Sequence, residues 1–175
     1  MKKLYIDKDK LLKLTPTKNP FQSLTRSIIF QQLSGKEAGA ILKKFIALWS
    51  TKSAERIGRS QKRINQKKFP KPEEVLMCSD EELRSSGLSR GKVVYIKDLA
   101  TKFLDSSIAP HRFKTMSDQN IIDHLVKVKG IGTWTAHMFL IFGLNRSNIL
   151  PTGDLAIKKD FKKYSNFPLF RPKKK

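Results

Sequence analysis

The chain has 175 residues, enough for a domain whose hydrophobic core needs no metal or disulfide support. It carries 36 Lys plus Arg against 15 Asp plus Glu, a formal net charge of +21 that favours a polyanionic partner such as nucleic acid. Hydrophobic residues make up 39% and include 11 Phe, which excludes a disordered polycation. The single cysteine, Cys78, excludes an internal disulfide and a four-cysteine metal site and indicates a reducing compartment.

The sequence also argues against a membrane protein. No apolar run approaches the ~20 residues that a membrane helix requires. The first residues, Met1 to Asp7, lack the apolar segment of a signal peptide. We therefore expect a soluble chain with no membrane association.

Apolar residues at helical spacing predict the first half of the fold. From Phe21 to Leu33 they indicate a buried helix that ends in polar residues. A second helix follows Ser34 and keeps a continuous apolar face up to Trp49. Residues 50–68 are basic and polar, and we expect a mobile basic loop there. Two interpretations of this loop stay open, a solvated insertion without a specific role and a segment that contacts phosphates.

Serines at capping positions predict the helices of the second half. Ser79 begins a capping box in front of a short helix. Ser89 and Ser117 can cap two further helices, each with a continuous apolar face, and another helix is indicated near residues 136–142. No segment shows the alternation of a strand, so we predict a single, compact, all-α, multi-helix domain over residues 1–175.

The most informative stretch is a glycine-rich connection in an expected helical hairpin at about residues 118–143. Glycine allows a tight turn and the close approach of another backbone. Thr133 can cap the second helix, whose first N–H groups could hold a phosphate. An ordinary glycine-rich connection is the alternative. We predict that five consecutive residues contact the DNA backbone: Lys129, Gly130, Ile131, Gly132 and Thr133.

Two separated motifs resemble one protein family. The segment from Val128 to Ala136 and the later segment from Pro151 to Ile157 are similar to the helix-hairpin-helix DNA glycosylases, specifically the 3-methyladenine DNA glycosylase II (alkylpurine DNA glycosylase) branch. In this branch a Gly/Pro-rich loop and an aspartate follow the hairpin. Here Asp154 lies 154 − 132 = 22 positions after Gly132. The resemblance extends over roughly residues 20–165.

The resemblance implies a monofunctional DNA glycosylase that removes alkylated purines such as 3-methyladenine by N-glycosidic bond hydrolysis in base excision repair. As the bond breaks, the deoxyribose gains oxocarbenium character, which a carboxylate can stabilise. Asp154 matches the family's catalytic aspartate, in an expected catalytic loop and helix at about residues 150–164. Its alternative role is a helix N-cap, which is compatible with catalysis.

Trp134 matches the family tryptophan that lines the pocket for the extruded base. Its indole face would favour a cationic purine by roughly 0.5–2 kcal/mol, and a core position is the alternative. In lyase-active relatives this position is a lysine that forms a Schiff base with the sugar. The resemblance therefore implies that water is the nucleophile and that the strand stays intact.

A side chain must also fill the gap that the extruded base leaves. By resemblance, the loop with Gln31, Gln32 and Leu33 supplies it. We favour Gln32 and keep Leu33 as the alternative, while a simple polar helix end explains the same residues. The resemblance allows a monovalent cation on hairpin main-chain carbonyls, and otherwise we expect no cofactor and no metal, because the three histidines lack ligand spacing.

The partner implied is double-stranded DNA with alkylated bases, bound by a monomer. We expect the protein to be located in the nucleus if it comes from a eukaryote, and otherwise in the cytoplasm or nucleoid. Because the family continues after the aspartate helix, we expect a domain shortened at the C-terminus, with an open face either at Phe139 and Phe142 or at the aspartate helix. The alternatives are a non-catalytic helix-hairpin-helix DNA-binding protein and an RNA-associated basic protein.

Overall fold

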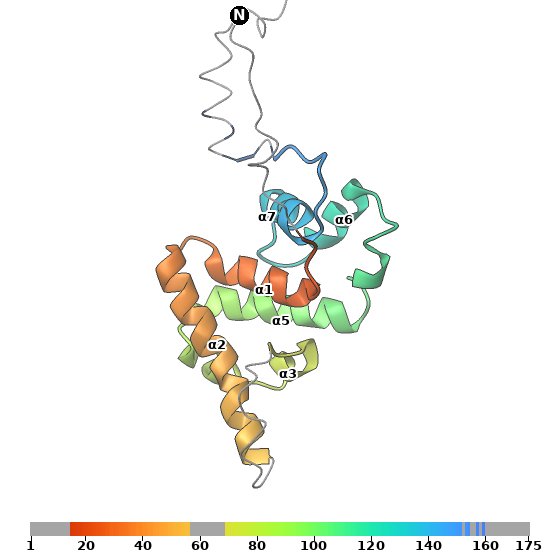
Figure 1. The fold of residues 1–175 in the computed structure, drawn as a ribbon. Coiled ribbons are helices and arrows are strands. Elements are labelled where there is room, and N and C mark those ends of the chain that lie inside the picture. Colours follow the sequence, from red (N-terminus) through yellow and green to blue (C-terminus); the bar gives the residue numbers. More distant parts are fainter. Residues whose placement is uncertain (1–14, 57–68, 152, 155–156, 158, 160–175) are drawn as a thin grey trace, which may run out of the picture.

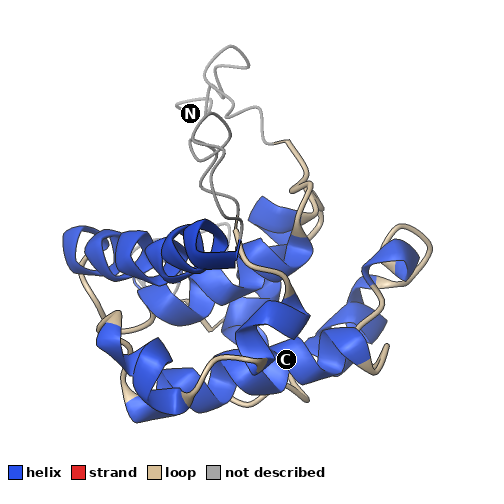
Figure 2. Ribbon diagram, turned by 90° about the horizontal axis from the view of Figure 1, so that it is seen from below, coloured by secondary structure: helices blue, strands red, loops and turns tan. Residues whose placement is uncertain are grey.

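The computed structural model describes residues 15–56, 69–151, 153, 154, 157 and 159. All regular structure within these residues is helical, which confirms the prediction of an all-α fold (Figure 2). The elements in chain order are α1 (Pro20–Phe30), α2 (Gly35–Arg56), α3 (Pro72–Leu76), α4 (Asp80–Ser85), α5 (Arg90–Leu104), the 3-10 turn η2 (Pro110–Arg112), α6 (Asp118–Leu125), α7 (Thr133–Met138) and the π-helical turn η3 (Phe139–Gly143).

The predicted capping serines each begin a helix. Ser79 Oγ accepts a hydrogen bond from the Glu82 N–H at 3.1 Å, and the Glu82 carboxylate accepts one from the Ser79 N–H at 2.8 Å. Ser89 and Ser117 also accept from the N–H three residues later. Caps of this kind stabilise a helix by about 1 kcal/mol each, which explains why these short segments are helical.

Helix α2 corrects one sequence-based expectation. The predicted loop begins at residue 50, but the helix continues to Arg56. The sequence predicts a loop there because residues 50–68 are basic and polar with few apolar residues. Helix formation does not require an apolar face, because residues such as Lys, Ala, Glu and Arg favour helix intrinsically. The rest of the expected loop, residues 57–68, lies outside the described residues.

Helices α1 and α5 lie side by side in the middle of the molecule (Figure 1). Helices α2 and α3 lie on one side of this pair, and α6 and α7 lie on the other. Helix α5 packs against α1, α3 and α4, while α1 also contacts α2 and η3. The middle pair therefore connects the two halves of the fold.

Aromatic side chains form much of the core. The Phe21 ring meets those of Phe69 and Phe103 edge-on, with centroids 6.1 Å and 5.2 Å apart. In η3, Phe139 is 2% exposed and packs on Phe113, whereas Phe142 is 57% exposed. The expectation of an open face is therefore wrong for Phe139, which turns into the core, and right for Phe142. Among the described residues, no helix could span a membrane.

Candidate active site

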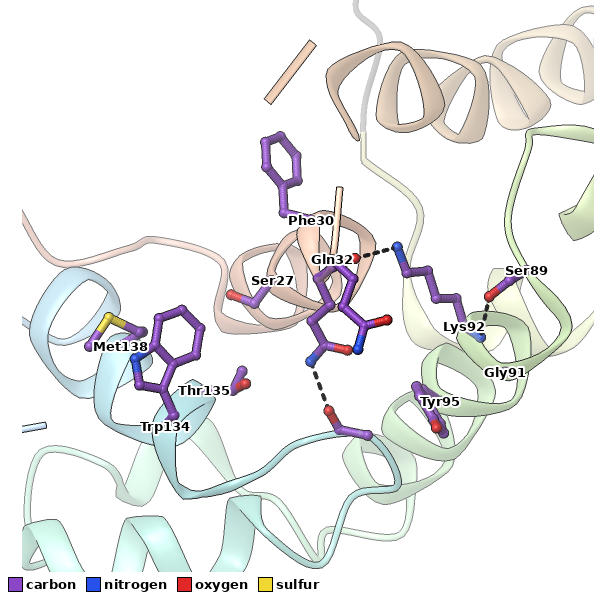
Figure 3. Close-up of a pocket in the computed structure, with 12 residues that line it drawn as sticks. Ser27, Phe30, Gln32, Ser89, Gly91, Lys92, Tyr95, Trp134, Thr135 and Met138 are labelled. Atoms are coloured by element: carbon purple, nitrogen blue, oxygen red, sulfur yellow. Dashed lines mark hydrogen bonds between the residues drawn. The ribbon is translucent and has the colours of Figure 1, made fainter. Parts of the chain in front are cut away.

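A cavity of about 720 Å³ opens where three parts of the chain meet (Figure 3). Its wall is formed by the end of α1 with the loop that follows, by the start of α5, and by α7 with the preceding hairpin turn. Trp134 and Met138 project from α7 on one side, and Lys92 and Tyr95 lie on α5 on the other, with Gln32 between them. A cavity of this size suits a small organic ligand or a single nucleotide base.

The hairpin turn requires glycine at one of its two glycine positions. Gly130 has a φ of 80°, and a Cβ there would lie 2.2 Å from the Tyr95 ring. Gly132 has an ordinary φ of −94°, and a Cβ there would meet no atom within 4 Å. Gly130 is therefore fixed by the fold, while Gly132 leaves open space where another backbone could approach.

The other predicted hairpin residues differ in their surroundings. The Lys129 N–H donates to Asp98 Oδ2 at 2.8 Å. The Ile131 side chain is 4% exposed, so Ile131 can contact a ligand only through its main chain. Thr133 is exposed at the first position of α7.

Thr133 is not the cap of α7 that the sequence predicted. The helix starts one residue earlier, because the Gly132 carbonyl accepts the Ala136 N–H at 3.0 Å and Gly132 occupies the N-cap position. Gly132 has no side chain, so no side-chain hydrogen bond caps α7. The first N–H groups of a helix also lack intrahelical partners.

Trp134, which lines the cavity, contacts Asp154, which lies 20 positions further along the chain. Trp134 Nε1 donates a hydrogen bond to Asp154 Oδ2 at 2.8 Å. Asp154 Oδ1 also accepts from the Ile157 N–H at 3.3 Å, as an N-cap does. The Trp134 side chain is 46% exposed and lines the cavity, so the alternative of a core tryptophan is wrong. Of the expected catalytic segment at residues 150–164, positions 152, 155, 156, 158 and 160–164 lie outside the described residues.

The structure brings two of the three residues of the predicted plug loop to the cavity, including Gln32, the favoured plug. Gln31 and Gln32 line it, and Gln31 Nε2 donates to the Gly130 carbonyl at 2.8 Å. Gln32 is exposed and has a φ of 56°. Leu33 is 36% exposed and is not part of the cavity wall.

Sequence reasoning missed two charged residues on α5 at this site. Lys92 Nζ donates to the carbonyls of Ile29 and Gln31 at 2.7 and 2.9 Å, and burial lowers the pKa of its ammonium group. Burial opposes ionisation of Asp98, but the hydrogen bonds from Lys102 Nζ and the Lys129 N–H outweigh it and hold its pKa below the ordinary value. In the sequence, only the spacing of Lys92 and Asp98 on one face of a helix could have pointed to them. That spacing does not indicate which segments pack against this face.

Within the described residues, no group of three or more His, Cys, Asp or Glu side chains could hold a metal ion. A monovalent cation on hairpin carbonyls stays a prediction. One of those carbonyls, that of Gly130, already accepts the Gln31 amide.

An all-α fold in which a glycine-containing turn joins two helices beside a cavity defines a helix-hairpin-helix protein. A family model described as "HhH-GPD superfamily base excision DNA repair protein" matches residues 25–174. The chain belongs to this superfamily.

Two curated relatives align with most of this sequence. It is 31% identical over 152 residues to DNA-3-methyladenine glycosylase 1 of Schizosaccharomyces pombe, covering 86% of this chain and 60% of that protein. It is 33% identical over 147 residues to the DNA-3-methyladenine glycosylase of Saccharomyces cerevisiae, covering 82% of this chain and 46% of that protein.

Solved structures of 3-methyladenine DNA glycosylases are also similar to this chain. The 3-methyladenine DNA glycosylase of Schizosaccharomyces pombe in complex with abasic DNA superposes with a TM-score of 0.67 at 33% identity, covering 85% of this chain and 65% of that one. The DNA-3-methyladenine glycosidase of Bacillus halodurans gives a TM-score of 0.71 at 33% identity, covering 86% and 62%. The chain thus spans less than two thirds of the length of these relatives.

Proposed function

We propose that the chain is a monofunctional DNA glycosylase that removes alkylated purines such as 3-methyladenine from double-stranded DNA in base excision repair. The hydrogen bond between Trp134 and Asp154 carries this proposal, because it holds a carboxylate against the exposed indole that lines the cavity. The names of the relatives support the choice of reaction and substrate.

The two side chains suit the steps of this reaction. An alkylated purine is cationic, and the exposed indole face of Trp134 would attract it. When the N-glycosidic bond breaks, positive charge develops on the deoxyribose, and the Asp154 carboxylate would stabilise it and orient the attacking water. The bonds to Trp134 and Ile157 fix the direction of the carboxylate before substrate arrives.

The hairpin would bind the DNA backbone. Gly132 leaves room for a phosphate, and the first N–H groups of α7 have no side-chain cap. The net charge of +21 supplies attraction that does not depend on sequence. Gln32, exposed beside the cavity, would fill the gap left by the extruded nucleotide.

The cavity contains one amine, but its environment does not suit Schiff-base chemistry. Lys92 Nζ donates to two main-chain carbonyls, and it would have to leave both before attacking a sugar. Trp134 stands at the position of the lyase lysine and has no nucleophilic nitrogen. Water is therefore the nucleophile in the proposed reaction, and the product is an abasic site in an intact strand.

An excision assay on methylated duplex DNA, which scores released base and abasic sites separately, tests the proposal. We expect the chain to release cationic purines, and Asp154→Asn to lower the single-turnover rate about 100–1,000-fold with DNA affinity retained. Asp123→Asn, an exposed carboxylate on α6, is the matched control and should excise normally. Borohydride should trap no covalent protein–DNA complex.

Three outcomes would contradict parts of this proposal. Binding without base release would favour the non-catalytic DNA-binding alternative. Unchanged release by Asp154→Asn would reject Asp154 as the catalytic carboxylate. A borohydride-trapped complex would reject the monofunctional assignment and direct attention to Lys92.

A further inference from the structure

The end of helix α1 depends on a side chain from α5. Carbonyls in the last turn of a helix need partners from outside the helix. The carbonyls of Ile29 and Gln31 obtain theirs from Lys92 Nζ, at 2.7 and 2.9 Å. Lys92 is 63 and 61 positions away along the chain, so it joins two distant segments.

Charge and burial favour this contact. The C-terminal end of a helix carries partial negative charge, so an ammonium group there is stabilising. Lys92 is partly buried, and hydrogen bonds are stronger where water is partly excluded. Its main-chain N–H is bound by the capping oxygen of Ser89 at 3.3 Å, which fixes the first turn of α5.

The loop that follows α1 contains a conformation that requires support. Gln32 has a φ of 56°, a region that residues with side chains rarely adopt. Such conformations persist only where the surrounding contacts determine them. On the far side of the loop, Ser34 Oγ donates to the Glu37 carboxylate at 2.7 Å and accepts the Glu37 N–H at 3.3 Å. Gln32 thus lies between two fixed points, Lys92 and the start of α2.

The same face of α5 also holds the hairpin. Lys92, Tyr95 and Asp98 are three residues apart, so they lie on one side of the helix. The Tyr95 ring lies against Gly130, and Asp98 Oδ2 accepts the Lys129 N–H at 2.8 Å. Helix α5 therefore contacts both the hairpin, through Tyr95 and Asp98, and the loop with Gln32, through Lys92 (Figure 3). Lys92 thus fixes the position of this loop relative to the hairpin.

From these contacts we infer that Lys92 is a positioning residue for base extrusion, and the inference rests on the proposed function. By binding the carbonyls of Ile29 and Gln31, Lys92 holds Gln32 at the cavity in the conformation from which the Gln32 side chain enters the duplex. Lys92 acts through Gln32 and the loop and does not act on the reacting atoms. Its effect belongs to the step that removes the base from the stack.

Lys92→Met, which keeps most of the length of the side chain and removes its donors, tests this inference. Single-turnover excision of 7-methylguanine is measured in duplex DNA and in single-stranded DNA, where no stacked base pair must be opened. We expect about a tenfold loss on duplex, the effect of a lost charged hydrogen bond, and less than a threefold loss on single strands. Lys92→Arg, whose guanidinium can donate to both carbonyls, should restore most of the duplex rate.

Gln32→Ala provides a second, independent measurement. If Lys92 acts through Gln32, the double variant should lose no more than Gln32→Ala alone, whereas independent roles would multiply the two losses. Lys97→Met, on the same helix with its ammonium paired to Asp80, is the matched control and should behave as wild type. If Lys92→Met does not fold, Lys92→Leu, which also has no donor, takes its place with the same expectations.

The results separate this inference from the proposed function. Wild-type protein that excises no base overturns the proposed function and, with it, the inference. Active wild type with equal losses for Lys92→Met on both substrates, multiplied losses in the double variant, or no loss at all overturns the inference alone.

Discussion

Trp134 and Asp154 form a unit in which one side chain positions the other. The indole N–H holds one carboxylate oxygen, while the indole face stays open to the cavity. An asparagine at position 154 could keep only one of the two acceptor roles of the carboxylate. Substitutions at Trp134 can separate the hydrogen bond from the aromatic face.

Trp134→Phe and Trp134→Ala make this separation. Phe keeps an aromatic face and loses the N–H, so excision of 7-methylguanine, a cation, and hypoxanthine, which is neutral, should fall by similar factors. Ala also loses the face, and the loss for the cation should exceed that for the neutral base by roughly 0.5–2 kcal/mol. Single-turnover rates measure both effects. Equal losses in Trp134→Ala would indicate a packing role only.

The two hairpin glycines predict opposite outcomes for substitution. Gly132→Val should weaken binding to undamaged duplex DNA and leave the melting temperature close to wild type, because space is open there. Gly130→Ala should lower the free energy of unfolding by about 2–4 kcal/mol, from its positive φ and its collision with Tyr95. Fluorescence anisotropy and thermal melting measure the two quantities. Full DNA affinity in Gly132→Val would reject the proposed phosphate contact.

At the scale of elements, α5 supports both loops that line the cavity. Its residues contact the end of α1 through Lys92 and the hairpin through Tyr95 and Asp98. Asp98 also pairs with Lys102 one turn later at 2.8 Å. The hairpin therefore depends on an ionised carboxylate outside its own sequence.

The contribution of Asp98 to the free energy of unfolding should depend on pH. Its folded-state pKa lies below the ordinary value, so its stabilisation is complete above that ordinary value and is lost as pH falls through the folded pKa. Urea unfolding of Asp98→Asn should show a deficit of about 1–3 kcal/mol at pH 7. The deficit should shrink toward zero as pH falls below about 4. A deficit that is equal at pH 7 and pH 3 would contradict this account, and Asp123→Asn provides the control.

At the scale of the whole molecule, charge determines how DNA affinity responds to salt. With a net charge of +21, binding should release many counterions. If six to ten phosphates are contacted, affinity should fall about 10³–10⁵-fold between 50 and 200 mM salt. Titrations of undamaged duplex at several salt concentrations measure this slope. A salt-insensitive complex would contradict backbone binding by the basic surface.

Much of the fold could be predicted from local patterns. Ser79, Ser89 and Ser117 begin helices because a cap depends only on residues three positions away. The prediction was wrong where it assigned a loop from residue 50 onward on basic, polar composition, since helix formation does not require apolar residues. The predicted N-cap of α7, Thr133, is one residue too late, because Gly132, which has no side chain, takes the N-cap position.

The all-α class and the helical hairpin follow from local patterns, and the resemblance to a family singled out Trp134 and Asp154 separately. Only the packing of the helices shows that these two side chains form a hydrogen bond, and which residues of the Gln31–Leu33 loop reach the cavity. Lys92 meets Ile29 across 63 positions, and Gln31 meets Gly130 across 99. Such contacts depend on how α1, α5 and the hairpin pack together, and no local sequence pattern contains that information.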